Sequence, residues 1–191
     1  VIGEDSSSHE FDYNENLHIK KIKTAYGVKI ENEYDSVYEN NIISSKTSNS
    51  DETKILLTKK SYTSDGRFVN SEEDELGNKT TYSSYNSFGK PTSIINALNI
   101  LTNYEYTSDG SLKQILLSNN ISSISSNYTY DSKKRLKTIE LDNGSIYDFN
   151  YDNYGNIIEI KLNNITIFKY NYDLKTGNLI EQSFGANGDK Y

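Results

Sequence analysis

A tyrosine returns along almost the whole chain at a nearly constant spacing, and this repetition constrains the fold more than any other feature. Successive members lie 21, 28, 23, 21, 24, 21 and 21 residues apart. These ladder tyrosines are Tyr13, Tyr34, Tyr62, Tyr85, Tyr106, Tyr130, Tyr151 and Tyr172. A fixed period in this range is typical of repeat proteins, in which each repeat adds one supersecondary unit. Such arrays build long surfaces and walls more often than catalytic clefts.

Between the ladder tyrosines, apolar and polar side chains alternate with the period of a β-strand. Ile158, Ile160 and Leu162, for example, alternate with Glu159 and Lys161, and no segment shows the 3.6-residue period of a helix. The alternation in the last third of the chain predicts an antiparallel meander. Its strands are expected at residues 136–141, 145–151, 157–162, 165–172 and 179–184.

Short polar segments between these runs predict the turns. Asp142-Asn143-Gly144 is interpreted as a type I′ hairpin turn, which needs positive φ at both central residues. Asn163-Asn164 serves the same role, because Asn tolerates the left-handed region. The Ser- and Asn-rich segments 44–53 and 118–127 are interpreted as longer loops that account for the two widest tyrosine intervals.

The repeated aromatic-x-Tyr run, Tyr-Asp pair and Gly-polar step resemble the YD repeats of the Rhs family. That family includes toxin shells, Tc-toxin cocoon subunits, wall-associated bacterial proteins and teneurins. The residues that carry the signature are Tyr62, Gly66, Tyr85, Gly89, Tyr106, Gly110, Tyr130, Asp131, Tyr151, Asp152, Gly155, Tyr172, Asp173 and Gly177. The resemblance implies an all-β fold, in which antiparallel β-hairpin repeats form a curved, spiralling sheet, a partial YD-repeat β-shell.

The match is uneven along the chain and suggests a domain organisation. Residues 1–9 are expected to be a flexible lead-in, and residues 10–57 to be divergent repeats in which Leu17 and Tyr38 replace the turn glycine. Residues 58–191 are expected to be regular repeats of the same continuous domain, with the array truncated at the C-terminus. Rhs shells end in a self-cleaving Asp-Pro-x-Gly element, whereas Pro91 follows Lys90 here. We therefore expect a fragment from the middle of an array.

Composition excludes several classes of protein and site. The chain has 191 residues, no Cys and a net charge of -7, so disulfides and thiolate metal sites are excluded. Its acidity disfavours nucleic acid as a partner, and no apolar stretch reaches the ~20 residues that membrane insertion requires. The length is sufficient for one domain with a hydrophobic core.

Few residues suggest chemistry. His9 and His18 are the only histidines, and both are interpreted as exposed side chains. The acidic run at residues 72–75 lacks the spacing of an EF-hand loop and is interpreted as a solvated face. No phosphate-binding loop or nucleophile elbow is present. We therefore expect no catalytic, cofactor or metal site, and not an enzyme.

Two classes of function stay open. In the first, the chain is a structural segment of a secreted or cell-surface shell that encloses, carries or displays a cargo domain, such as a C-terminal toxin. Its partners are then the rest of the parent repeat array and that cargo. In the second, the chain is an extracellular adhesion module that binds glycan, cell wall or a partner surface. The candidate contacts are Tyr38, Tyr82 and Tyr154, which fall outside the ladder, and the alternative for each is packing in a turn.

Overall fold

The computed structural model describes residues 8–185 and 189–190, and all of them lie in strands, turns or irregular segments. The chain divides into two compact units, residues 1–101 (unit 1) and residues 102–191 (unit 2). The all-β class is confirmed. Within the part that the structure describes, no helix has the length and apolar character needed to cross a bilayer.

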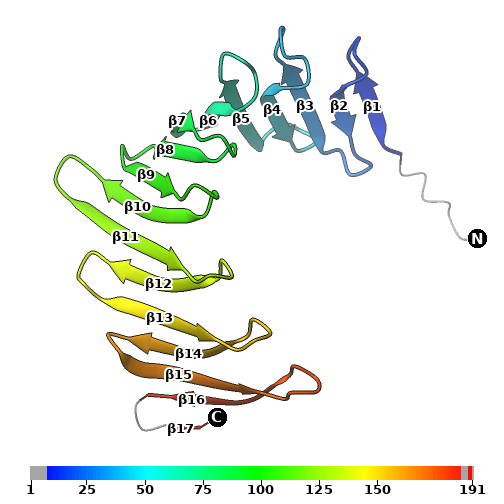
Figure 1. The fold of residues 1–191 in the computed structure, drawn as a ribbon. Coiled ribbons are helices and arrows are strands. Elements are labelled where there is room, and N and C mark those ends of the chain that lie inside the picture. The colour runs from blue at the N-terminus through cyan, green and yellow to red at the C-terminus, as the bar shows by residue number, and fades with distance from the viewer. Residues whose placement is uncertain (1–7, 186–188, 191) are drawn as a thin grey trace, which may run out of the picture. The chain divides into compact units, whose positions relative to one another are not determined.

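Unit 1 is an antiparallel meander in which each strand pairs with the next (Figure 1). Its strands are β1 (Glu10–Tyr13), β2 (Ile19–Lys23), β3 (Lys29–Tyr34), β4 (Ile42–Ser48), β5 (Ile55–Tyr62), β6 (Val69–Asp74), β7 (Lys79–Tyr85) and β8 (Pro91–Ile95). Because the meander is open, the outer edge of β1 has no paired neighbour among the described residues.

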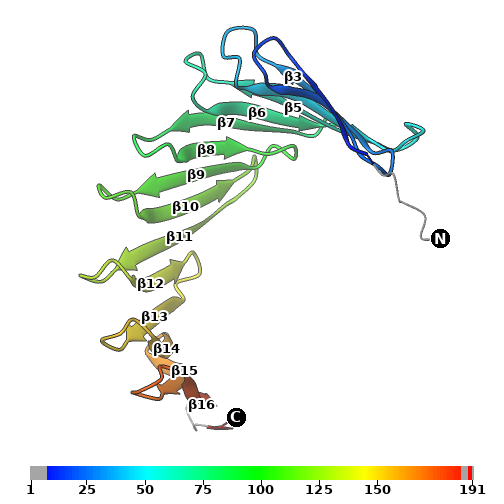
Figure 2. The same cartoon turned by 90° about the vertical axis from the view of Figure 1, so that its right-hand side faces the viewer.

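Unit 2 continues the same kind of meander from β9 onward. Its strands are β9 (Leu101–Tyr106), β10 (Leu112–Ser118), β11 (Ser123–Tyr130), β12 (Leu136–Leu141), β13 (Ile146–Tyr151), β14 (Ile157–Leu162), β15 (Ile165–Tyr172), β16 (Leu179–Phe184) and β17 (Asp189–Lys190). Figure 2 views β13–β16 nearly edge-on and shows no second layer over either face of these strands.

The meander predicted for the last third of the chain is confirmed. Four of its five strands have the predicted bounds, and β13 begins one residue later than expected, at Ile146. The agreement follows from the side-chain period, because a half-buried strand needs one face apolar and the other polar.

The two predicted long loops are wrong. Ile42–Ser48 and Ser123–Tyr130 are strands, so that residues 44–48 and 123–127 belong to β4 and β11. Only residues 49–54 and 119–122 remain as turns. The Ser and Asn residues of these strands lie in a single-layer sheet whose faces are partly open to water, and polar side chains are therefore compatible with strand structure there.

The turn at residues 142–144 differs from the prediction. Gly144 has φ of 79°, but Asn143 is not in the left-handed region. The amide of Gly144 donates to the carbonyl of Leu141, and the amide of Leu141 to that of Ser145. These bonds describe a type I turn followed by a left-handed bulge residue, the common three-residue hairpin loop. Asn163 and Asn164, with φ of 49° and 67°, adopt the predicted conformation.

The expected hydrophobic core is not formed. Among the described residues no apolar side chain is fully buried, and the residues that are buried are Ser48, Ser71 and Gly110. Apolar side chains of unit 2 instead pack beside one another on one face, as in the row Phe149, Ile160, Phe168 and Phe184 across β13–β16. The opposite face of the same strands carries Asp148, Asn150, Glu159, Lys161 and Lys169.

Some predicted segments fall partly outside the described residues. The lead-in assigned to residues 1–9 is described only at residues 8 and 9. The dipeptide Asn187-Gly188, whose composition predicts a further turn, lies outside the described residues.

Candidate functional site

The ladder tyrosines occupy one equivalent position in the fold. Each of them is the last residue of an odd-numbered strand, from Tyr13 of β1 to Tyr172 of β15. They therefore stand side by side near one rim of each unit. We call the turns that follow these tyrosines the tyrosine rim, and the turns that follow the even-numbered strands the second rim.

A β-bulge accompanies the tyrosine in nearly every repeat. Tyr151 pairs with Ile157, whereas Asn150 pairs with Glu159, so Ile158 is an extra residue on β14. The same shift occurs at Tyr13, Tyr34, Tyr62, Tyr85, Tyr130 and Tyr172. Bulges increase local twist and re-aim side chains. Here the bulge gives every repeat the same geometry at its tyrosine.

The tyrosine hydroxyls join successive repeats. In six of the ladder tyrosines, the hydroxyl donates to the backbone carbonyl of the first residue of the strand before the tyrosine's own. The pairs are Tyr34 to Ile19 (2.8 Å), Tyr62 to Ile42 (2.9 Å), Tyr85 to Val69, Tyr130 to Leu112 (2.9 Å), Tyr151 to Leu136 (2.8 Å) and Tyr172 to Ile157 (3.1 Å).

The accepting residue is in most cases the partner of the previous ladder tyrosine. Leu136 pairs with Tyr130 and accepts from Tyr151, and Ile157 pairs with Tyr151 and accepts from Tyr172. Burial raises the pKa of Tyr130 and Tyr151 above the usual value. The protonated hydroxyls thus act as donors that connect one repeat to the next.

The aspartates of the Tyr-Asp pairs organise the tyrosine rim. Oδ1 of Asp131 accepts from the amides of Lys133 and Arg135, and Oδ1 of Asp173 accepts from those of Lys175 and Thr176. Asp152 does the same with the amides of Tyr154 and Asn156. Donation by the backbone amides, that of Arg135 first, lowers the pKa of Asp131. The chemistry that these three positions share is therefore turn closure.

The signature glycines follow in the same turns with left-handed backbone. Gly66, Gly89, Gly110, Gly155 and Gly177 have φ between 69° and 99°. At Gly66 there is a second requirement, because a Cβ would come within 2.2–2.5 Å of ring atoms of Tyr38. Only glycine satisfies both conditions at this position.

Two further residues occupy the glycine position without being glycine. Leu17 has φ of 61°, as its predicted replacement of the turn glycine requires, and Lys134 has φ of 64°. The prediction that Tyr38 replaces a turn glycine is wrong, because the backbone of Tyr38 is not left-handed. Tyr38 lies instead in a longer loop, which is closed by a hydrogen bond from the amide of Asp35 to the carbonyl of Asn41. The only sign of this conformation in the sequence is that Lys134 aligns with the turn glycines of other repeats.

Arg135 makes a contact between two repeats that the sequence did not indicate. Its guanidinium donates to Oδ2 of Asp131 (2.7 Å) and to the carbonyl of Asp152 (2.9 Å). The same group lies 4.4 Å from the ring centroid of Tyr151, in cation–π geometry. Arg135 thus connects the turn after β11 to the ladder tyrosine and the turn of the next repeat.

The three candidate contact tyrosines lie in different environments. The Tyr38 hydroxyl donates to the carbonyl of Ser64 (2.8 Å), and its ring covers the turn of the following hairpin, with 37% of the residue exposed. Tyr82 is half-buried on β7 and donates to Glu72 (3.1 Å). Tyr154 is 80% exposed at the tip of its turn. Tyr38 and Tyr82 thus have different partners within unit 1, and Tyr154 belongs to unit 2.

The acidic run and His18 are less exposed than predicted. Glu72 pairs with Lys60 (2.8 Å) and accepts from Tyr82, so the run is not wholly a solvated face. His18 is half-buried beside Tyr34, with ring centroids 5.2 Å apart, and its Nδ1 is buried without a hydrogen-bond partner. Within residues 8–185 and 189–190, no three His, Asp or Glu side chains are grouped to hold a metal ion.

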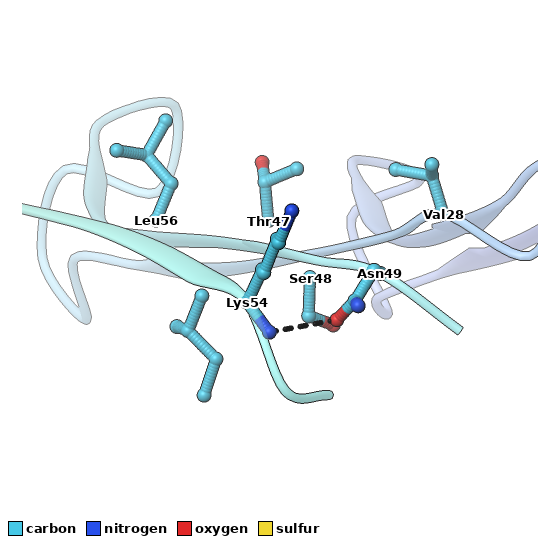
Figure 3. Close-up of a pocket in the computed structure, with 7 residues that line it drawn as sticks. Val28, Thr47, Ser48, Asn49, Lys54 and Leu56 are labelled. Carbon is cyan, nitrogen blue, oxygen red and sulfur yellow. Dashed lines mark hydrogen bonds between the residues drawn. The ribbon is translucent and has the colours of Figure 1, made fainter. Parts of the chain in front are cut away.

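The hollows of the surface are shallow. One lies on the second rim of unit 1 between the turn after β2 and the turn after β4, where Val28, Thr47 and Leu56 project from the sheet (Figure 3). The amide of Lys54 donates to Oδ1 of Asn49 at its border (2.9 Å). Its lining has no nucleophile paired with a base, and the arrangement suits packing rather than catalysis.

Comparison with known proteins agrees with this arrangement. The sequence matches the teneurin YD-shell family over residues 2–188, and no curated protein sequence matches it significantly. Among solved structures, a crystal structure of TcdB2-TccC3-Cdc42 has a TM-score of 0.58 at 14% identity, covering 95% of this chain and 12% of that one.

Two other solved structures give similar results. A crystal structure of TcdB2-TccC3 matches with a TM-score of 0.58 at 14% identity, over 94% of this chain and 12% of that one. A Tc holotoxin pore of Photorhabdus luminescens carrying a TccC3 mutation matches with a TM-score of 0.57 at 14% identity, over 95% and 11%. The chain thus spans about one eighth of these structures. It belongs to the YD-shell family.

Proposed function

We propose that this member of the YD-shell family is a non-enzymatic wall segment of a longer secreted or cell-surface shell, which encloses, carries or displays another domain. The observation that supports this proposal most directly is the linkage of successive repeats by tyrosine hydroxyls. Through these hydrogen bonds each repeat stabilises the next one, and an array of this kind can be extended by adding repeats to form a wall.

The chemistry of the sheet is consistent with a wall. In unit 2 one face carries the aromatic and aliphatic row Phe149, Ile160, Phe168 and Phe184, while the other face carries charged and amide side chains. A sheet with two such different faces is suited to separate two environments. The aromatic face then lies toward the interior of the shell and the polar face toward the surrounding water.

The partners follow from the length of the relatives. This chain spans about one eighth of the TcdB2-TccC3 structures that it resembles, so the remaining repeats of a parent array are the first partners that we propose. The second is a cargo domain, for example a toxin. Neither proposal needs a cofactor, and the chain offers no grouped catalytic side chains in the region described.

Protease protection tests the shell proposal. The parent protein would be expressed with its native flanking sequence, and a variant would lack residues 136–141, the single strand β12, so that the alternation of strand directions is broken at that point. Cargo in the intact protein should resist protease, and cargo in the shortened protein should be digested because the wall is interrupted. Tyr154→Ala serves as the control that leaves the wall intact. Equal digestion of cargo in the intact and shortened proteins would contradict the proposal.

A second candidate function is adhesion to glycan or to a partner surface. The observation that favours it is Tyr154, whose ring is 80% exposed at a turn tip; aromatic rings that stand free of their own fold are suited to stacking contacts. Glycan-array binding of the purified chain would be compared with that of Tyr154→Ala, with Tyr38→Phe and Tyr82→Phe as controls. Binding that is unaffected by Tyr154→Ala would exclude this site.

A further inference from the structure

The second rim of unit 1 carries apolar side chains at the tips of its turns. Tyr26, Leu76 and Leu98 are 89%, 80% and 78% exposed. Each occupies the same place in its turn, directly before the left-handed residue, which is Gly27, Gly77 or Asn99. The turn after β4 has Asp51 at this place, before left-handed Glu52. Single exposed apolar residues are common on protein surfaces, but apolar residues at equivalent positions in three turns of one rim indicate a contact surface.

A hollow lies between two of these tips. The turns after β6 and β8 are neighbours on the rim, because β7 and β8 pair. The hollow between them is lined by Gly77, Asn78, Lys79, Ile95, Asn96 and Ala97, among others. A Cβ added to Gly77 would meet no atom within 4 Å, so this side of the hollow is open to an incoming side chain.

Knob and hollow lie side by side on this part of the rim. Leu76 directly precedes Gly77 of the lining on one side of the hollow, and Leu98 lies between Ala97 and Asn99 of the lining on the other. Two strands separate successive turns, which places them about 10 Å apart. A surface on which a knob lies beside a hollow is self-complementary under a two-fold rotation, because each knob then enters the other copy's hollow.

The charges beside the knob and in the hollow are also complementary. Glu75 is exposed next to Leu76, and Lys79 is exposed in the lining of the hollow. A two-fold contact that seats Leu76 in the hollow of a second copy brings Glu75 toward Lys79 of that copy, and the symmetry repeats the attraction. Such pairs set register and orientation in an interface.

We propose that the second rim of unit 1 is an interface between two copies of this chain. Leu76 enters the hollow between the turns after β6 and β8 of the second copy, and Glu75 faces Lys79 across the contact. This inference goes beyond the wall proposal and does not depend on it, since it concerns the turn tips and not the faces of the sheet.

Sedimentation velocity of the purified chain over a range of concentrations tests the interface. The wild-type chain should show a concentration-dependent dimer. Leu76→Ser should raise the dissociation constant at least about tenfold, as expected for a central apolar anchor. Leu174→Ser is the matched control, because Leu174 is 86% exposed on the tyrosine rim of unit 2, and it should leave dimerisation unchanged. Far-UV circular dichroism verifies that each variant is folded.

Charge reversal tests the orientation of the contact. Glu75→Lys and Lys79→Glu should each weaken the dimer, because each creates two like-charge contacts, and the double variant should recover it. A chain that stays monomeric up to about 1 mM, a Leu76→Ser variant that dimerises like the wild type, or a double variant without recovery would overturn the proposal. A dimer lost only on Phe11→Pro would instead assign the contact to the open edge of β1.

Discussion

The hydroxyl of Tyr151 donates to the carbonyl oxygen of Leu136 at 2.8 Å, and Leu136 is itself the strand partner of Tyr130. Two successive ladder tyrosines therefore meet at one residue, the first through strand pairing and the second through its side chain. The relationship explains why tyrosine, and not phenylalanine, recurs at these positions.

The contribution of this bond can be measured by removing only the hydroxyl. Tyr151→Phe leaves the carbonyl of Leu136 without its side-chain donor, and we expect the free energy of unfolding to fall by about 1 kcal/mol. Urea denaturation followed by circular dichroism measures the change. Tyr154→Phe removes an exposed hydroxyl and should have almost no effect. Equal losses in the two variants would mean that the ladder bond adds nothing to stability.

Arg135 should not tolerate replacement by lysine. A lysine keeps the charge but cannot contact Asp131, the Asp152 carbonyl and the Tyr151 ring together. We expect Arg135→Lys to lower the free energy of unfolding by about 1–2 kcal/mol. Arg67→Lys is the control, since the Arg67 guanidinium lies 5.4 Å from the ring centroid of Phe68 and has a weaker contact. If both replacements lower the free energy of unfolding equally, the contact of Arg135 with the next repeat is not the cause of the loss.

Replacing Leu17 by glycine should stabilise unit 1. Leu17 holds a left-handed backbone, φ 61°, with an 81% exposed side chain, and relief of this strain is worth about 1 kcal/mol. Glu15→Gly in the same turn is the control, because Glu15 is exposed and is not left-handed; this variant should lose stability through the added freedom of the unfolded chain. The midpoints of thermal unfolding compare the two. A midpoint for Leu17→Gly below that of the wild type would contradict the prediction that the Leu17 backbone is strained.

The turn aspartates predict a loss of stability in acid. Backbone amide donors lower the pKa of Asp131 and Asp173 in the folded chain, whereas an unfolded aspartate titrates near about 3.9. A lowered folded pKa means that the carboxylate contributes stability above about pH 4, and that this contribution is lost as pH falls through the folded pKa. Urea denaturation between about pH 2 and pH 6 should show this decline.

Asparagine provides the control for the acid effect. Asp131→Asn keeps an oxygen that accepts from the amides of Lys133 and Arg135 but cannot titrate. The decline in acid should therefore be shallower in this variant than in the wild type. An unchanged pH profile would show that other groups cause the decline.

The strands and most turns could be predicted because they depend on local patterns. The alternation around Ile160 gives β14 its bounds, and the glycine at Gly155 marks its turn. The bond from Tyr151 to Leu136 could not be predicted, because it depends on the stacking of repeats and on a bulge that shifts the register by one residue. Arg135 was missed for the same reason, since its ring partner lies in the next repeat.

The errors have a common physical cause. Residues 44–53 and 118–127 are interpreted as loops from the sequence because polar residues are usually excluded from strands that pack against a core. In a single layer, both faces keep some contact with water, and a serine or asparagine costs little there. The same property makes composition a poor guide to the fold of such a chain.

The absence of fully buried apolar side chains in the described residues has a thermal consequence. The heat capacity change of unfolding arises mainly from newly hydrated apolar surface, and averages about 12–15 cal/mol/K per residue in compact globular domains. A single layer never removes these groups fully from water, so its unfolding exposes less new apolar surface. Its heat capacity change per residue is therefore smaller. Its stability curve is therefore flatter, so that warming or cooling alters the stability of the sheet only gradually over a wide range of temperature.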